Sequence, residues 1–248
     1  MARDFTKNTA NYMSLGVNAL GALLNGASII SVSMWIQADT LTATANNNRL
    51  FSVYNFNGNT ALTFLTDATS HLRVGGRSNL EGFQFKDSTT AIATGGAWTH
   101  CGGVYNIGGD TITPYLNGVA EGGGAVTFSA ATWTNAPPTT TNDIIGGDAA
   151  TAGGGPTAVG QQIDGRLAEF AVWVGVDIGA ANMRLLSQQR GGKDLLRIHR
   201  ASLVYYLPLY GDASPEPAII GTPVGTITGT VAAAAHLPYS GYDQAVGL

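Results

Sequence analysis

Apolar and polar residues alternate in short segments along most of the chain. The clearest segment is residues 29–36, where every second residue from Ile30 to Ile36 is apolar and two of the positions between them are serines. A period of two is the side-chain period of a β-strand, so this segment predicts a strand with one buried face. Comparable segments predict further strands at residues 12–15, 50–54, 61–66, 71–75, 82–85, 98–105, 111–116, 143–146, 203–209 and 224–230.

Turn-forming residues separate these segments, for example Asn57-Gly58, Gly75-Gly76 and Asn117-Gly118. Regular short strands interrupted by Gly, Asn and Asp are typical of antiparallel sandwiches and jelly rolls. Pro114 has no N–H to donate, so its strand is expected at a sheet edge or with Pro114 facing outward. We therefore predict an all-β fold of two antiparallel sheets.

Residues 164–173 predict a strand of a different kind. One face would carry Ala168, Phe170, Val172 and Val174, and the other would carry Leu167, Glu169, Ala171 and Trp173. Because both faces are largely apolar, we expect this strand in the middle of a sheet with cover on each side. The acid within it, Glu169, is interpreted as structural, paired with Arg73 or Arg77.

One segment has helical spacing. Within residues 178–189, Ala180, Met183 and Leu186 can form one stripe, and Gly191 is a natural stop. A further helical turn is expected at residues 193–199. The fold is thus predicted to carry one or two short helices.

No domain boundary is apparent before about residue 211, in a chain of 248 residues. We expect one jelly-roll domain over residues 1–210 and a C-terminal extension, 211–248, that forms an extra strand or an extended arm. The first residues lack the apolar core of a signal peptide, which suggests folding in a cytoplasm. No run of ~18 apolar residues is present, so no membrane-spanning helix is expected.

The chain is poor in charge, with only 11% of residues charged, about half the usual ~25%. Such a surface favours coverage by neighbouring molecules, although a monomer coated in Ser, Thr and Asn is the alternative. The net charge of −4 gives no support for nucleic-acid binding. Cys101 is the one cysteine, so an internal disulfide is excluded.

Five segments in the order 30–36, 98–105, 115–119, 164–173 and 203–209 resemble the concanavalin A-like lectin/glucanase domains of the laminin-G type. The resemblance covers roughly residues 5–210. It implies two antiparallel sheets packed as a jelly roll, with the helix after residues 164–173 lying outside. The sequence resembles most the versions that are stand-alone virion proteins of tailed bacteriophages.

The glucanase branch of this family carries its carboxylates in a Glu-x-Asp-x-x-Glu strand, and no acids of this chain have that spacing. Asp164 and Glu169 would project to opposite faces of one strand. We therefore expect no catalytic residues and no enzyme.

No metal or cofactor site is expected either. The histidines are scattered, without a zinc-binding spacing. Asp110, Asp143 and Asp148 leave a calcium ion conceivable in this fold, but they do not assemble the six or more oxygens it requires, and solvated turn aspartates are the simpler interpretation.

Two sets of residues are candidates for binding. The first is a basic cluster that would dock an acidic partner, although it could also be an ordinary solvated helix surface: Arg184, Arg190, Lys193, Arg197 and Arg200. The second is Trp133 with Asn135, which would contact a glycan if the indole ring is exposed. The alternative for Trp133 is that it caps the core or a subunit contact.

Together these expectations describe a non-enzymatic bacteriophage virion protein that decorates or cements the capsid. Its partner would be the major capsid protein or another virion protein, it would form homo-oligomers, and it would be assembled in the host cytoplasm. No cofactor, nucleic acid or membrane would be involved. The alternative is a lectin-like module that binds host-receptor carbohydrate on a tail or head fibre.

Overall fold

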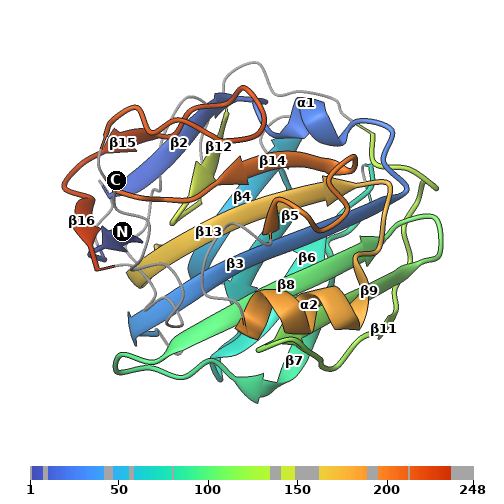
Figure 1. The fold of residues 1–248 in the computed structure, drawn as a ribbon. Helices are drawn as coiled ribbons and strands as arrows, with labels where there is room; N and C mark the ends of the chain where they lie inside the picture. Colours follow the sequence, from blue (N-terminus) through green and yellow to red (C-terminus); the bar gives the residue numbers. More distant parts are fainter. Residues whose placement is uncertain are drawn as a thin grey trace.

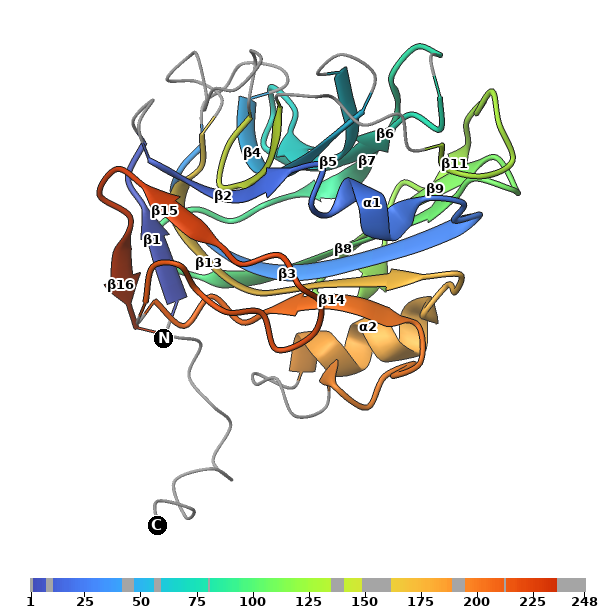
Figure 2. The same ribbon diagram turned by 90° about the horizontal axis from the view of Figure 1, so that it is seen from above.

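The computed structural model describes residues 2–7, 11–41, 47–55, 59–79, 81–134, 141–148, 162–188, 195–211 and 213–235. Two antiparallel β-sheets pack face to face, and one helix lies outside them (Figure 1). Figure 2 shows the two sheets as separate layers, with α2 on the outer side of one of them. The predicted all-β sandwich is confirmed.

The sheet next to α2, called sheet A, has nine strands within the described residues, and every pairing in it is antiparallel. Its main path is β10 (Val119–Ala120), β9 (Thr111–Leu116), β8 (Trp98–Asn106), β3 (Ile29–Thr40), β13 (Asp164–Val174), β1 (Ala2–Phe5) and β16 (Ala232–Ala234). In addition, β11 (Gly124–Ala125) pairs with β9, and β14 (Leu203–Leu207) pairs with β13. Pro114 lies between the residues of β9 that pair with β10 and those that pair with β11, where no ladder N–H is required.

The opposite sheet, sheet B, has seven strands in the described part of the chain. Their order is β15 (Thr226–Thr228), β2 (Tyr12–Val17), β12 (Asn142–Ile145), β4 (Asn47–Asn55), β5 (Asn59–Thr66), β6 (His71–Gly76) and β7 (Gln84–Ala91). The main core lies between the two sheets, where Phe51 contacts both Phe64 and Phe170 with ring centroids 4.9 and 5.0 Å apart.

A second apolar cluster fills the space between sheet A and α2 (Gly179–Gln188). Met183 and Leu186 of the helix are buried in it against Trp173 and Val104 of the sheet. The backbone of β8 comes close here, because a Cβ on Gly102 would lie 2.6 Å from the Met183 sulfur. The predicted helix is confirmed, and Met183 and Leu186 of its predicted apolar stripe are buried, whereas Ala180 is exposed. The chain makes a further turn at residues 195–202.

The pattern predicted β15, which lies within residues 224–230, but it missed β1 and β16 at the two ends of the chain. β1 is only four residues long and includes Arg3 and Asp4, so it shows no clear alternation, yet it pairs with both β13 and β16. Residues beyond 210 contribute β15 to sheet B and β16 to sheet A. The division of the chain at residue 210 stays a prediction.

The strand β13 lies mid-sheet as expected, but a bulge changes its faces. Its register against β3 shifts between Ala168 and Ala171, and Glu169 has a left-handed φ of 56°. One extra residue in a strand reverses which side chains face the core. Leu167 therefore lies in the main core together with Phe170, on the face where Ala168 was predicted.

The bulge also decides the partner of Glu169. Its carboxylate is 3% exposed and accepts a hydrogen bond from the Tyr206 hydroxyl of β14. Pairing with Arg73 or Arg77 was wrong, because Arg73 forms two hydrogen bonds to Asp87 at the far edge of sheet B, of 2.7 and 2.8 Å.

Within the described residues, neither helix is long and apolar enough to cross a bilayer.

Candidate functional site

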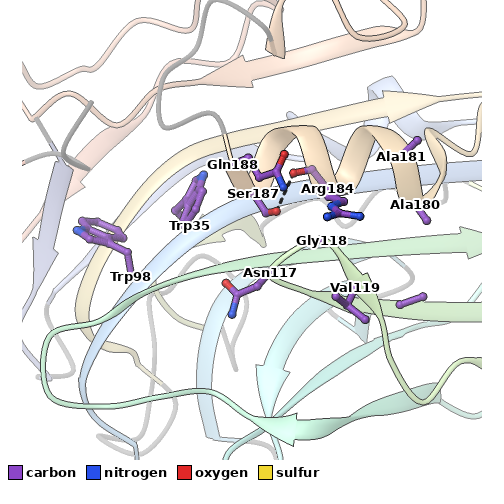
Figure 3. A pocket seen from close by; sticks show the side chains of 11 residues that line it. Trp35, Trp98, Asn117, Gly118, Val119, Ala180, Ala181, Arg184, Ser187 and Gln188 are labelled. Atoms are coloured by element: carbon purple, nitrogen blue, oxygen red, sulfur yellow. Dashed lines mark hydrogen bonds between the residues drawn. The ribbon is translucent and has the colours of Figure 1, made fainter. Parts of the chain in front are cut away.

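An open groove of about 940 Å³ lies on the outer side of sheet A, between α2 and the hairpin that joins β9 to β10 (Figure 3). Four separate parts of the chain form it: β3, β8, the hairpin and α2. The described residues that line it are Trp35, Trp98, Asn117, Gly118, Val119, Ala120, Ala180, Ala181, Arg184, Ser187 and Gln188.

Two tryptophans occupy one end of the groove. Trp35 is on β3 and Trp98 is on the neighbouring β8, where register pairs Trp35 with His100 and Gln37 with Trp98. The Trp35 ring meets the His100 ring edge-on, with centroids 5.2 Å apart at 69°. Trp35 is nearly buried, whereas Trp98 is half-buried and packs against the small cluster around Trp35. The pair offers a supported aromatic surface at the end of the groove.

His100 contacts the Trp35 ring and supports this end of the groove. Its Nε2 lies 2.8 Å from the Ser33 hydroxyl, and both side chains are buried. Burial lowers the pKa of His100 to about 3, so the ring is neutral at physiological pH. Although Ser33 and His100 could be taken for a nucleophile and its base, neither reaches the solvent, and we assign them a structural role.

The hairpin side of the groove is a tight turn. Asn117 and Gly118 have φ values of 48° and 79°, the left-handed pair typical of a type I′ turn. The Asn117 Oδ1 accepts a hydrogen bond of 3.0 Å from the His100 backbone N–H, which leaves its Nδ2 to donate to a ligand. A Cβ on Gly118 would lie 2.4 Å from the Arg184 Cα, so the turn packs directly against α2.

The helix side supplies the polar groups. Arg184 and Gln188 are exposed and Ser187 is half-buried, one turn of α2 apart. The Ser187 hydroxyl donates 2.8 Å to the Arg184 carbonyl oxygen. Figure 3 shows the Arg184 guanidinium between the helix and the hairpin. An open groove with indoles at one end and amide, hydroxyl and guanidinium groups along its length can hold a polar ligand that has one apolar face.

The structure describes three of the five residues of the predicted basic cluster. Arg184 lines the groove, while Arg197 and Arg200 are exposed on the turn that follows α2. Arg190 and Lys193 lie outside the described residues. Docking of an acidic partner on this cluster stays a prediction.

Trp133 does not form an exposed platform. Its side chain is 1% exposed and belongs to the main core, and its backbone is tied to Gly26 and Ala27 by hydrogen bonds of 2.9 and 2.7 Å. This corrects the suggestion that Trp133 contacts a glycan and agrees with the alternative that it caps the core. Asn135 lies outside the described residues.

The aspartates considered for calcium serve local structure. The buried Asp143 carboxylate accepts hydrogen bonds from the backbone N–H groups of Leu20 and Gly21, at the start of α1 (Gly21–Leu24), and from that of Tyr54. Burial raises the pKa of Asp143 to about 7, against the effect of the bonds from Gly21 and Leu20. Asp148 forms a 2.9 Å ion pair with Arg49. In the described part of the chain, no three His, Cys, Asp or Glu side chains are grouped to hold a metal ion.

Each of the four glutamates is engaged by a different set of donors. Each accepts hydrogen bonds from its own neighbours: Glu81 from Ser78, Asn79 and Ser129; Glu121 from Thr89 and Thr90; Glu169 from Tyr206; and Glu216 from Arg3 and Gly211. None of them lines the groove.

Sequence reasoning missed the groove because its residues are far apart in the chain. The available signal was the pairing of β3 with β8, which places two tryptophans on the same face of adjacent strands. The Asn117-Gly118 turn was identified, but only as a hairpin signal.

Comparisons with known proteins agree with this fold. The family model described as the concanavalin A-like lectin/glucanases superfamily matches residues 7–176. None of the curated proteins is a significant match to the sequence.

Solved structures share the fold at low sequence identity. A Bacteroides ovatus protein described as carbohydrate-binding has a TM-score of 0.64 and 18% identity, covering 96% of this chain and 61% of its own. The CBM40 module of a Ruminococcus gnavus sialidase, in a structure with α2,3-sialyllactose, has a TM-score of 0.52 and 13% identity, covering 75% of this chain and 98% of its own. A heptameric SAP-like pentraxin of Limulus polyphemus has a TM-score of 0.51 and 15% identity, covering 75% of this chain and 80% of its own.

Proposed function

Because this chain belongs to the concanavalin A-like lectin/glucanases superfamily, we propose that it is a non-catalytic module that binds an oligosaccharide in the groove beside α2. Membership alone does not select this function, since one fold hosts many activities. The choice depends on the groove itself.

The observation that carries the proposal is the position of Trp98 and Trp35 beside free hydrogen-bonding groups. A sugar ring has an apolar C–H face and a rim of hydroxyls, so it can stack on an indole while its rim bonds to amides and guanidinium groups. Trp98 is half-buried and supported by Trp35, so little entropy is lost when a ligand stacks on it. Asn117 and Gln188 supply amides within the same groove.

The described residues that line the groove include no carboxylate, which supports binding without hydrolysis. A glycosidase needs two carboxyl groups about the bond that it cuts. No Asp or Glu is found among the described residues that line the groove. The carbohydrate-binding descriptions of the Bacteroides and Ruminococcus structures favour the same function for this chain.

A glycan array with the wild-type protein and Trp98→Ala tests the proposal. We expect the wild type to bind a defined set of glycans and the variant to lose about tenfold in affinity, since an aromatic contact contributes about 1–2 kcal/mol. Phe85→Ala is the matched control, because Phe85 is 42% exposed on β7 of the other sheet. Wild-type protein that binds no glycan, or equal affinity in Trp98→Ala, would refute the proposal.

The second candidate is a structural role in a bacteriophage particle, as a capsid decoration or cement protein. The low proportion of charged residues, 11%, favours a surface covered by neighbours. Exposed apolar residues such as Val119, at 59%, and Val17, at 46%, suit such contacts. Its partners would be the major capsid protein or another virion protein, and copies of the chain itself. Mass spectrometry of purified particles tests this role, and particles without the protein would exclude it.

A further inference from the structure

We propose that the groove selects acidic sugars, with Arg184 binding the carboxylate or sulfate group. This inference rests on the proposed carbohydrate-binding function and names the class of sugar. It depends on the charges in and around the groove.

Arg184 is the one charged side chain among the described residues that line the groove; the others are aromatic, amide, hydroxyl or small apolar residues. The groove is therefore locally positive on a protein whose net charge is −4. An anionic group of a ligand would find attraction there and, among the described lining residues, no carboxylate to repel it.

The Arg184 guanidinium is available to a ligand. The side chain is exposed, and none of the ion pairs found in the described part of the chain involves it. Two acids close in sequence to the lining segments have donors of their own. Asp177 accepts 2.7 Å from the Gly179 N–H at the start of α2, and Glu121 accepts 3.0 and 2.7 Å from Thr89 and Thr90.

The backbone under Arg184 is well held. Its Cα lies against the Gly118 turn, and its carbonyl oxygen accepts a hydrogen bond from the Ser187 hydroxyl. Arg184 itself lies within α2. A guanidinium presents two parallel N–H groups that match the two oxygens of a carboxylate or sulfate. A guanidinium keeps its charge at physiological pH, whereas His100, which supports the groove, is neutral there, so Arg184 is the cation among the described lining residues that can select the ligand.

The arrangement of Figure 3 then assigns each part of an acidic sugar a place. The apolar face of one ring lies on Trp98, while the acidic group lies on Arg184. Hydroxyls in between accept from the amide nitrogens of Asn117 and Gln188. A neutral sugar would keep the stacking and the amide bonds but lose the charged contact.

The test compares ligands that differ in charge and little else: sialyllactose with its methyl ester, an oligogalacturonate with its methyl ester, and a sulfated galactoside with its unsulfated form. Isothermal titration at low ionic strength should show the wild type binding at least one acidic member about fivefold more tightly than its neutral counterpart, with the difference reduced by salt. Arg184→Gln should remove the preference by weakening the acidic member more than its neutral counterpart, and Arg184→Lys should restore part of it. Arg200→Gln, an exposed arginine outside the groove, should leave it unchanged.

The outcomes separate this inference from the proposed function. Equal affinity for acidic and neutral members, or a preference that survives in Arg184→Gln, overturns the selection of acidic sugars while sugar binding stands. Binding of no member of either kind overturns both. Gln and Lys are both good helix formers at an exposed helix position, so circular dichroism should show that both Arg184 variants remain folded.

Discussion

The contact between the Asn117-Gly118 turn and α2 can be tested by adding a single methyl group. Gly118 and Gly26 both have a φ of 79°, but their surroundings differ. A Cβ on Gly118 would lie 2.4 Å from the Arg184 Cα and 2.6 Å from the Ser187 hydroxyl, whereas a Cβ on Gly26 would meet nothing within 4 Å. Gly26→Ala is therefore a control that carries the backbone strain without the steric clash.

The two substitutions should differ by the cost of moving the hairpin from the helix. An alanine with left-handed φ costs about 1–2 kcal/mol at either position. At Gly118 the methyl group meets helix backbone, which cannot rotate away, so we expect a further ~1–3 kcal/mol, as for an overpacked site. The free energy of unfolding should fall by ~1–2 kcal/mol in Gly26→Ala and by ~2–5 kcal/mol in Gly118→Ala.

Urea unfolding followed by tryptophan fluorescence measures this difference directly. Because the hairpin forms one wall of the groove, Gly118→Ala should also weaken glycan binding, and Gly26→Ala should not. Equal loss of stability in the two variants would refute the close approach of Gly118 to α2. Unchanged glycan binding in Gly118→Ala would show that the hairpin does not shape the binding site.

Two further predictions concern buried ionisable groups. Arg3 and Glu216 form a 2.8 Å pair, 4% and 2% exposed, that ties β1 to the C-terminal segment. Glu216→Gln leaves the guanidinium buried without its counter-charge, so the free energy of unfolding measured in urea should fall by about 3–5 kcal/mol. The double variant Arg3→Met/Glu216→Leu should recover part of this loss. A loss below ~0.5 kcal/mol would contradict a buried pair. The pKa of Asp143, raised by burial to about 7 from an ordinary value of ~4, means that the folded state holds this proton more tightly than the unfolded chain. The stabilisation from protonated Asp143 is complete below about pH 4 and is lost as the pH rises through 7. The free energy of unfolding should therefore increase from pH 8 to pH 5, and Asp143→Asn should reduce this dependence on pH. An equal pH dependence in the variant would exclude Asp143 as its source.

Strand positions and the helix could be predicted because their signals are local. Alternation locates β3 and β8, and the spacing of Met183 and Leu186 locates α2, since each pattern lies within about a dozen residues. β1 and β16 are too short to show a period, and they are strands only because β13 offers an edge to β1 and β1 offers one to β16. Their formation depends on partners more than 150 residues away in the sequence, as in the pairing of Arg3 with Leu167.

The bulge at Glu169 shows a different limit. Leu167, Ala168, Phe170 and Ala171 are all apolar, so the sequence reads equally well with or without an inserted residue. Pairing with β3 decides which side chains of β13 face the main core, and pairing with β14 places Tyr206 beside Glu169. The burial of Trp133 could not be predicted either, because the direction of a loop side chain depends on the free space in the core and not on neighbouring residues in the sequence.

The groove itself follows from a difference in length between α2 and the strands beneath it. A helix of 10 residues spans about 15 Å, whereas the 12 residues of β3 span about 40 Å. α2 can therefore cover only part of sheet A, and Figure 1 shows it lying along β8. Trp35 and Trp98 lie where Gln188 ends the helix, so their rings line the groove instead of joining the cluster under α2. Since the end of the helix sets how much of the tryptophan pair is open, a substitution that moves α2 should change ligand affinity without touching Trp98, which is why Gly118→Ala is informative about function as well as stability.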